Sequence, residues 1–397
     1  MNKKISVLVV SVMSLSLLAA CSTPAATTTA AGTTAGTTAA ATTVAGTTAA
    51  GTTAAGTTAA GTTTATTQAP KTIVGPVAGK AGSIVKMGLG IISSVAKSTD
   101  FTAEKPGAAQ ADVIAAAVGF DKDGKVVAIT IDNGQTKVEF NADGTLKSDV
   151  AATYMTKQEK KEAYGMIKAS KIGYEWYQQA ESLSAWMQGK TVAEIKSMKT
   201  KAGADAAHPA VPDEADLVSS VSITVQDYIA VVEKAWTNAV EVKEGADKVG
   251  LGFNISIASS KAKTADKPAS AQIDNTISAI ALKGDKVAAT VLDIVQAKVA
   301  YDADGKVTTD KTAEVKSKVE LGDEYGMKKA SKIGKEWFEQ AKALTDWTVG
   351  KTAAEIKGIP SEDKDGKKIV TGDLATSVSV GVADYLASFD EAIMMAR

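Results

Sequence analysis

Hydrophobic and polar residues alternate with a period of two over several stretches of the chain, which is typical of half-buried β-strands. Asp- and Gly-containing sequences at 121–124 and 141–144 separate these stretches and are typical of tight turns. Together they predict an antiparallel meander. Its expected strands cover 84–95, 111–120, 126–131 and 136–140.

Helical spacing replaces this alternation further along the chain. Apolar residues recur every three to four positions over 157–188 and predict a helix, which Gly165 and Gly173 would interrupt. A short helix is expected over 192–198, and a final helix from Asp216 to about residue 239. Because the strands come first and the helices later, the pattern predicts an α+β fold.

The whole pattern occurs twice. Residues 163–196 and 324–357 are identical at 22 of 34 positions. The sequences at 86–90 and 216–222 also have counterparts, 162 and 157 residues further on. A period near 160 residues indicates a domain duplication rather than a solenoid repeat. Expected strands of the second copy cover 271–282, 287–294 and 297–301, with turns at 283–285 and 302–305.

We therefore expect two homologous domains, 83–240 and 246–397, each with an antiparallel sheet followed by helices. The junction between them is short and charged, so we expect the domains to lie close together.

The first 20 residues are typical of an export signal. A basic start at Lys3 and Lys4 precedes an apolar run over 5–20, which is too short for a comfortable membrane span. The run ends in small residues directly before Cys21, the single cysteine of the chain, and this resembles the lipobox of a lipoprotein. An ordinary signal peptide with a chance cysteine is the alternative. Two acyl chains on Cys21 would give stable membrane anchoring.

Residues 21–75 are expected to be the lipidated cysteine followed by a disordered linker. From Ser22 to about residue 67 the chain is almost entirely Ala, Thr and Gly, with no large apolar residue at helix or strand spacing. Such a composition cannot offset the entropy cost of folding. The simplest interpretation is a spacer that holds the folded part away from the membrane, although its Thr content would also suit O-glycosylation.

Composition excludes several kinds of site. One cysteine rules out an internal disulfide framework and a cysteine-based cluster, and the single histidine, His208, rules out a multi-histidine metal site, so no metal site is expected. With 44 basic and 45 acidic residues the formal net charge is −1, which argues against nucleic acid as a partner. No Ser–His or Cys–His pair is available to both copies, and no Gly-rich phosphate loop follows a strand.

One short motif recurs where each final helix is expected to begin. The first copy has Asp216, Ser219 and Ser222, and the second copy has Asp373, Thr376 and Ser379 at the same spacing. An acid and hydroxyls at a helix start are ordinary capping residues. The same exposed N–H groups would also bind a phosphate. From the residues alone, capping is the simpler interpretation.

The motif resembles Asp-x-x-Ser/Thr-Gly-Ala-Ser/Thr, the sequence that flavin transferases recognise in the FMN-carrying subunits of sodium-pumping and Rnf-type reductases. The resemblance implies that Ser222 and Ser379 each receive FMN through a phosphodiester, with Asp216, Asp373, Ser219 and Thr376 completing the recognised sequence. Both copies depart from the pattern in the same way. Gly is replaced by Ser220 and Ser377, and Ala by Val221 and Val378.

The lipobox, the Thr/Ala tether and the two motifs together resemble PplA-type flavolipoproteins of Gram-positive extracellular electron transfer. The resemblance implies a carrier with two covalent FMN groups, anchored on the outer side of the cell membrane. Its implied partners are a flavin transferase, a membrane NADH dehydrogenase or quinone pool, and extracellular acceptors such as ferric iron. It would be an electron carrier rather than a substrate-specific enzyme. A surface solute-binding or adhesive lipoprotein is the alternative.

Residues shared by the two copies are candidates for holding the flavin ring. Aromatic and Met side chains stack well on flat rings. The candidates are Tyr164, Met166, Tyr325 and Met327, with Gly165 and Gly326 between them; Trp176, Trp186, Trp337 and Trp347 are equally shared but fit a core role better.

Replacing Cys21 tests the anchor. We expect Cys21→Ala to move the protein from the membrane fraction to the medium, because the variant has no thiol to acylate. Fractionation followed by immunoblotting measures this. Retention of the variant on membranes at high salt would show that Cys21 is not the anchor.

Overall fold

A computed structural model describes residues 73–203 and 208–397. The predictions for the export signal, Cys21 and the tether fall outside these residues. Contacts group the chain from Gln68 onward into one compact unit. Residues 73–246 are called the first half below, and residues 247–397 the second half. In the described residues no helix is both long and apolar enough to cross a bilayer.

The first half contains the predicted antiparallel meander. Strands β1 (Ile84–Ser94), β2 (Gly107–Phe120) and β3 (Val126–Phe140) lie in the order β3-β2-β1. The two segments predicted over 126–140 are one continuous strand, because the polar residues between them stay in register with β2, Asp132 opposite Ala115. The junction, expected only as a connection, forms strand β6 (Val240–Ala246) and pairs with β1.

The second half repeats this sheet. Strands β7 (Lys248–Ser256), β8 (Ser270–Lys283) and β9 (Lys286–Ala300) form an antiparallel meander, and β9 again joins two predicted segments. The expected turn at 283–285 connects β8 to β9. The predicted α+β class, with antiparallel sheets packed against helices, is therefore confirmed.

The helices follow the prediction with one exception. As expected, the helical segment over 157–188 is interrupted: α1 (Lys157–Lys160) and α2 (Trp176–Met187) are separated by a loop in which Gly165 and Gly173 have positive φ values of 75° and 72°. The final helix α4 (Gln226–Thr237) begins well after Asp216, so the prediction that Asp216 opens it is wrong. The short helix α3 (Val192–Lys196) lies where it was expected.

The second half has the same helical order, and both halves contain short connecting elements. Its helices are α5 (Lys318–Leu321), α6 (Trp337–Thr348), α7 (Ala353–Lys357) and α8 (Ala383–Met394). The single-turn 3₁₀ segments are η1 (Lys161–Tyr164), η2 (Met166–Lys168), η3 (Gly322–Tyr325) and η4 (Gly372–Thr376). The short strands are β4 (Thr200–Lys201), β5 (Val211–Pro212), β10 (Ser361–Lys364) and β11 (Lys367–Val370).

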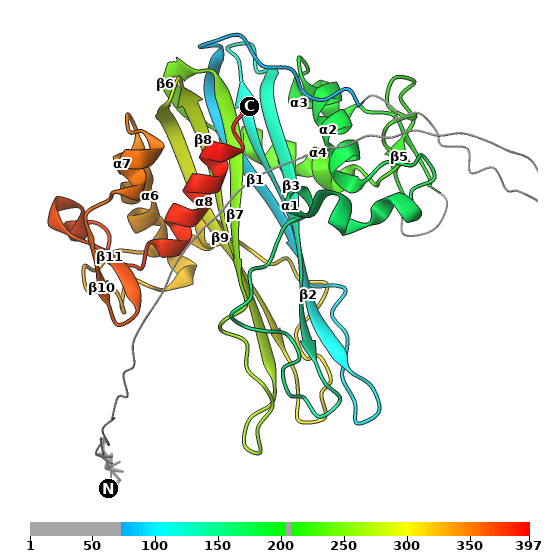
Figure 1. Ribbon diagram of the computed structural model, residues 1–397, viewed down its shortest axis with the longest axis vertical. Coiled ribbons are helices and arrows are strands. Elements are labelled where there is room, and N and C mark those ends of the chain that lie inside the picture. Colours follow the sequence, from blue (N-terminus) through cyan, green and yellow to red (C-terminus); the bar gives the residue numbers. More distant parts are fainter. Residues whose placement is uncertain (1–72, 204–207) are drawn as a thin grey trace, which may run out of the picture. The chain divides into compact units, whose positions relative to one another are not determined.

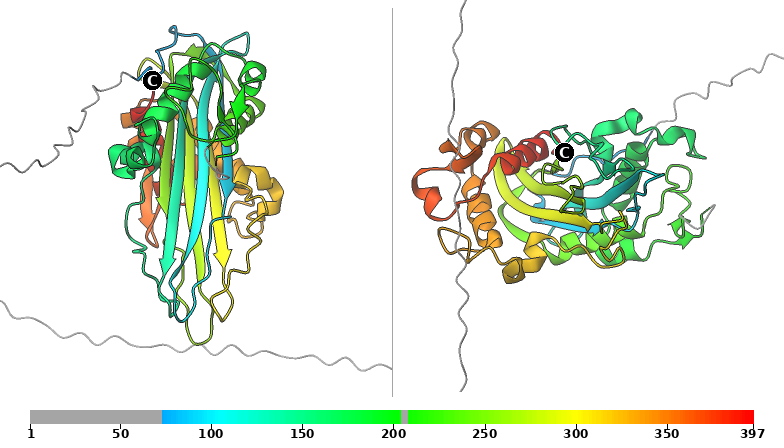
Figure 2. Two further views of the ribbon diagram at one scale, coloured as in Figure 1. Left: turned by 90° about the vertical axis from the view of Figure 1, so that its right-hand side faces the viewer. Right: turned by 90° about the horizontal axis from the view of Figure 1, so that it is seen from below.

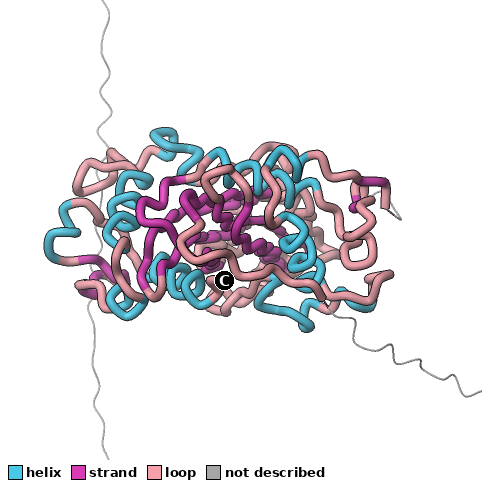
Figure 3. Tube along the Cα trace, turned by 90° about the horizontal axis from the view of Figure 1, so that it is seen from above, coloured by secondary structure: helices cyan, strands magenta, loops and turns pink. Residues whose placement is uncertain are grey.

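One hydrophobic core joins the two sheets. Alternate residues of β2 point into it and are largely Ala, and β8 contributes the matching alternate residues from the other side. Small side chains let the two sheets approach closely, and strands of both sheets occupy the centre of the molecule with helices around them (Figures 2 and 3). The buried residues are Ala109, Ala111, Val113, Ala115 and Ala117 of β2 and Ala271, Ile273, Ile277, Ala279 and Ala281 of β8.

Helices cover the outer face of each sheet (Figure 1). Helix α4 lies directly on β1 at Gly88 and Gly90, where a Cβ atom would fall 1.7 and 1.8 Å from backbone oxygens of α4. Helix α8 lies on β7 at Gly250 and Gly252 in the same way. The repeated Gly-x-Gly sequence is therefore a site of close helix–strand contact.

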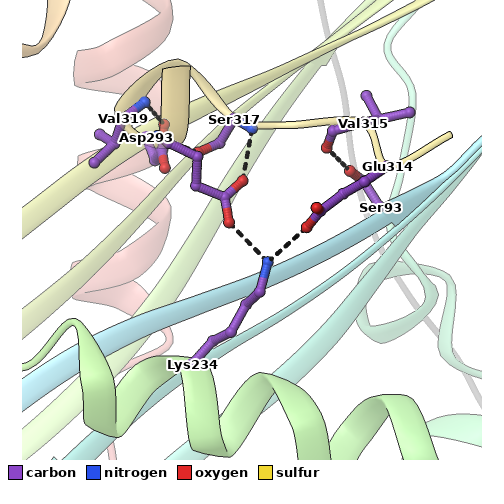
Figure 4. Close-up of polar contacts among 8 residues, drawn as sticks. Ser93, Lys234, Asp293, Glu314, Val315, Ser317 and Val319 are labelled. Carbon is purple, nitrogen blue, oxygen red and sulfur yellow. Dashed lines mark hydrogen bonds and ion pairs between the residues drawn. The ribbon is translucent and has the colours of Figure 1, made fainter. Parts of the chain in front are cut away.

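Polar contacts between the halves break this symmetry. Lys234 of α4 forms ion pairs with Glu320 at 2.7 Å and Glu314 at 3.4 Å in the second half (Figure 4). At the equivalent position of α8 stands Glu391, whose carboxylate accepts a hydrogen bond from the backbone N–H of Phe253. Burial raises the pKa of Glu391 to about 8, and the negative charges of Glu159 and Asp132 in the first half add to the shift.

Gly90→Ala tests the helix–strand contact. The added methyl group would overlap backbone atoms of α4, so we expect a loss of about 1–3 kcal/mol in the free energy of unfolding. Urea unfolding measures it. Gly75→Ala is the control, because no atom lies within 4 Å of its added Cβ, and this variant should unfold within about 0.5 kcal/mol of the parent. Equal stability of the two variants would contradict the close contact.

Glu391→Gln tests the buried carboxyl. The pKa of Glu391 is about 8 in the folded state and has the ordinary value of 4.5 in the unfolded state. Between pH 4.5 and pH 8, therefore, the carboxyl is ionised in the unfolded state and still protonated in the folded state. Stability from this group is therefore present below about pH 4.5 and is lost as the pH rises through 8. We expect the variant to be more stable than the parent at pH 8 and similar at pH 5. Urea titrations at both pH values measure this, with the exposed Glu362→Gln as control.

Candidate functional site

The motif of the first half lies on a turn between β5 and α4. Asp216 and Ser219 are exposed, and Ser222 is half-buried. Val225, not Asp216, precedes the first turn of α4, and no side chain caps that helix. The predicted capping role and the predicted phosphate site on the first turn of this helix are therefore wrong. In the second half Asp373 and Thr376 lie in the short segment η4, ahead of α8.

A buried glutamine holds the acceptor position of the motif. Gln179 of α2 is fully buried, and its Oε1 accepts hydrogen bonds from the backbone N–H of Ser222 at 2.8 Å and from its hydroxyl at 3.3 Å. The Nε2 of Gln179 donates to the hydroxyl of Ser170 and to the carbonyl of Tyr174, each at 3.2 Å. One amide thus fixes Ser222 against the loop that precedes α2.

The second half repeats this arrangement atom for atom. Oε1 of the buried Gln340 accepts from the N–H of Ser379 at 2.8 Å and from its hydroxyl at 3.2 Å. Its Nε2 donates to the hydroxyl of Ser331 and the carbonyl of Lys335, each at 3.1 Å. The role of the two glutamines was not predicted from the sequence, although they occupy the same position in the two copies of the repeat.

The departures from the flavin-transferase motif have structural reasons. Ser377 has a φ of −121°, and Ser220 is not among the residues with positive φ, so the backbone does not need glycine at this position. Val221 and Val378 are buried in the helical cores of their halves, where a larger apolar side chain than Ala is accommodated.

The Tyr-Gly-Met loop is tied to the residue that directly precedes α2. The carboxylate of Glu175, which is buried, accepts from the backbone N–H of Met166 at 2.7 Å and of Ile167 at 2.9 Å. Gly165 has the left-handed conformation that glycine favours, and no protein atom lies within 4 Å of an added Cβ. The second half repeats these features with Gly326, Met327, Lys328 and Glu336.

A buried lysine supports the tyrosine of this loop. Lys157 Nζ lies 4.8 Å from the ring centre of Tyr164 and 5.4 Å from that of Trp176. Burial lowers the pKa of Lys157 to about 8. In the second half Lys318 lies over Tyr325 and Trp337 at 4.7 and 5.2 Å, and its pKa is lowered to about 8 for the same reason. Sequence analysis missed these lysines because lysine in a helical segment is usually solvated.

The tryptophans divide into two pairs. Trp176 and Trp337 are buried core residues, and each indole N–H donates to a tyrosine hydroxyl at 2.9 Å. Trp186 and Trp347 are only partly buried. Trp347 lines a surface hollow of about 550 Å³ together with Asp373, Leu374, Ser377 and Pro360.

This neighbourhood fits a phosphate-linked flavin. A half-buried serine hydroxyl is fixed in each half. Beside the second motif, the hollow is lined by an indole, by apolar side chains and by Asp373 and Ser377, although not by Ser379 itself, and its volume is within the range of small-molecule sites. The exposed acids of the motif remain accessible to a modifying enzyme.

Within 73–203 and 208–397 no group of three or more His, Cys, Asp or Glu side chains is placed to hold a metal ion. No known protein family model matches the chain, and neither does any curated protein or solved structure.

Proposed function

We propose that the protein is a lipid-anchored extracellular electron carrier with two homologous FMN-binding domains, each bearing one covalent FMN. The observation that carries the proposal is the duplicated acceptor serine, held by a buried glutamine in both halves. Ser222 and Ser379 have the same two hydrogen bonds to Gln179 and Gln340, within 0.1 Å. The duplication has kept this geometry in both halves, so each half offers a fixed serine hydroxyl of the kind that a covalent FMN needs.

When bound, FMN supplies the one- and two-electron chemistry, and the protein supplies attachment and orientation. Ser222 and Ser379 would carry the phosphodiester, and the glutamines would fix their position. Tyr164 and Tyr325, each backed by a buried lysine, and Met166 and Met327 would lie near the ring. Covalent attachment suits a carrier outside the cell, where a dissociated cofactor would diffuse away.

The two motifs face opposite sides of the molecule. One follows β5 and the other follows β11, and both views place these strands on opposite sides of the shared core (Figures 1 and 2). Each flavin would therefore exchange electrons with partners at its own face. Those partners are a membrane NADH dehydrogenase or quinone pool as donor and extracellular acceptors such as ferric iron.

Serine variants test the attachment. We expect natively exported protein to gain the mass of two FMN groups, each less one water, because both hydroxyls are available to the flavin transferase. The gain should fall to one group in Ser222→Ala or Ser379→Ala and to none in the double variant. Intact-mass spectrometry measures this.

The fold should survive these changes, which circular dichroism checks, since each serine lies outside the helices and strands. Asp216→Ala and Asp373→Ala should lower flavin loading, because the acid belongs to the recognised motif. Two flavins on the double variant would place the linkage on another hydroxyl. No flavin on natively exported protein would overturn the proposal.

A solute-binding lipoprotein is a second candidate, favoured by one groove that both halves line. The groove has a volume of about 830 Å³ and lies between β6, β9 and α6. Its lining includes Val287, Val291, Phe338 and Ala341, together with Lys243 and Lys286. Colourless, flavin-free protein that binds an apolar solute in this groove would favour this candidate.

A further inference from the structure

The two motifs differ in charge at one neighbouring position. Lys335 of the second half is replaced by Tyr174 at the equivalent position of the first half. The ammonium nitrogen of Lys335 lies 3.1 Å from the hydroxyl oxygen of Ser377, two residues before the acceptor Ser379. Tyr174 is buried and has no ammonium group. A cation therefore contacts the motif in the second half and is replaced by a neutral ring in the first.

The backbone of Lys335 is bonded to the glutamine that holds the acceptor serine. The carbonyl of Lys335 accepts a hydrogen bond from Gln340, the same side chain that binds the acceptor Ser379. Ser377, the partner of the ammonium, also lines the 550 Å³ hollow with Asp373. Gln340 thus links the backbone of Lys335 to the acceptor hydroxyl, and Ser377 links its ammonium to the hollow.

The two motifs are alike in their acids and differ in one cation. Asp216 and Asp373 are both exposed, and the ammonium of Lys335 contacts Ser377 in the second motif. At this position a phosphate group entering the second motif meets an ammonium where the first half has a tyrosine. Lysine binds phosphate as a point charge, so this difference favours an anionic nucleotide at the second motif.

We infer that Lys335 pairs with the phosphate of the incoming flavin nucleotide and makes Ser379 the preferred acceptor. This inference rests on the proposed function. In the transfer, Oγ of Ser379 forms a bond to the FMN phosphorus of flavin adenine dinucleotide. The anhydride bond breaks, AMP leaves with the electron pair, and the hydroxyl proton passes to solvent. No group is oxidised or reduced. Lys335 acts as a positioning residue in this step.

The experiment measures transfer kinetics on each motif separately. Unmodified Ser222→Ala protein accepts flavin only in the second half, and Ser379→Ala protein only in the first. Each is titrated as acceptor with purified flavin transferase and flavin adenine dinucleotide, and the product is followed by intact mass. At low salt, we expect the KM of the Ser222→Ala acceptor to be about three- to tenfold lower than the KM of the Ser379→Ala acceptor. This difference in KM should disappear in about 0.5 M NaCl, because salt screens the attraction between the Lys335 ammonium and the phosphate.

Lys335→Met in the Ser222→Ala background should raise KM to the value of the first-half acceptor with little change in kcat. Lys335→Arg should restore the low KM, since it keeps the charge. Lys335→Met in the Ser379→Ala background is the matched control and should leave KM unchanged. The inference is overturned if Lys335→Met leaves the KM of the Ser222→Ala acceptor unchanged, or if Lys335→Met and Lys335→Arg raise this KM equally. Either result leaves the proposed function standing. No transfer to any variant overturns both.

Discussion

Close packing of two β-sheets through small side chains is the constraint on which the rest of this structure depends. Alternate alanines of β2 and β8 meet in one core, so neither sheet has a solvent-facing inner surface. The outer face of each sheet is also apolar and is buried under helices, and glycines on β1 and β7 let α4 and α8 lie directly on the strands. This arrangement places the two serine-bearing turns on opposite sides of one body.

Much of this fold follows from the sequence. Alternation and turn residues predict the strands, and the repeat predicts that both halves are built alike. Both faces of β2 are buried, and the sequence pattern does not show what covers either face, so the shared core and the pairing of β6 with β1 could not be predicted. The start of α4 was misplaced because Asp216 and the following hydroxyls mimic an N-cap, whereas the chain makes an exposed turn there.

The site was predictable only in part. The motif identified the acceptor serines, but Gln179 and Lys157 lie in segments where polar residues are usually solvated, and only tertiary packing shows that they are buried. The halves have also diverged where they meet each other and their surroundings. The ion-paired Lys234 of the first half is replaced at the equivalent place by Glu391, a carboxyl whose pKa burial raises to about 8, and Tyr174 is replaced by Lys335. A duplicated fold thus carries two sites with different electrostatics.

Peptide mapping of the natively exported protein tests the central claim most directly, because it locates the flavin without altering any residue. After proteolysis, flavin fluorescence is followed through chromatography and the fluorescent peptides are sequenced by mass spectrometry. The account predicts two fluorescent peptides, one modified at Ser222 and the other at Ser379, each heavier by FMN less one water. Unmodified peptides spanning both serines would contradict it.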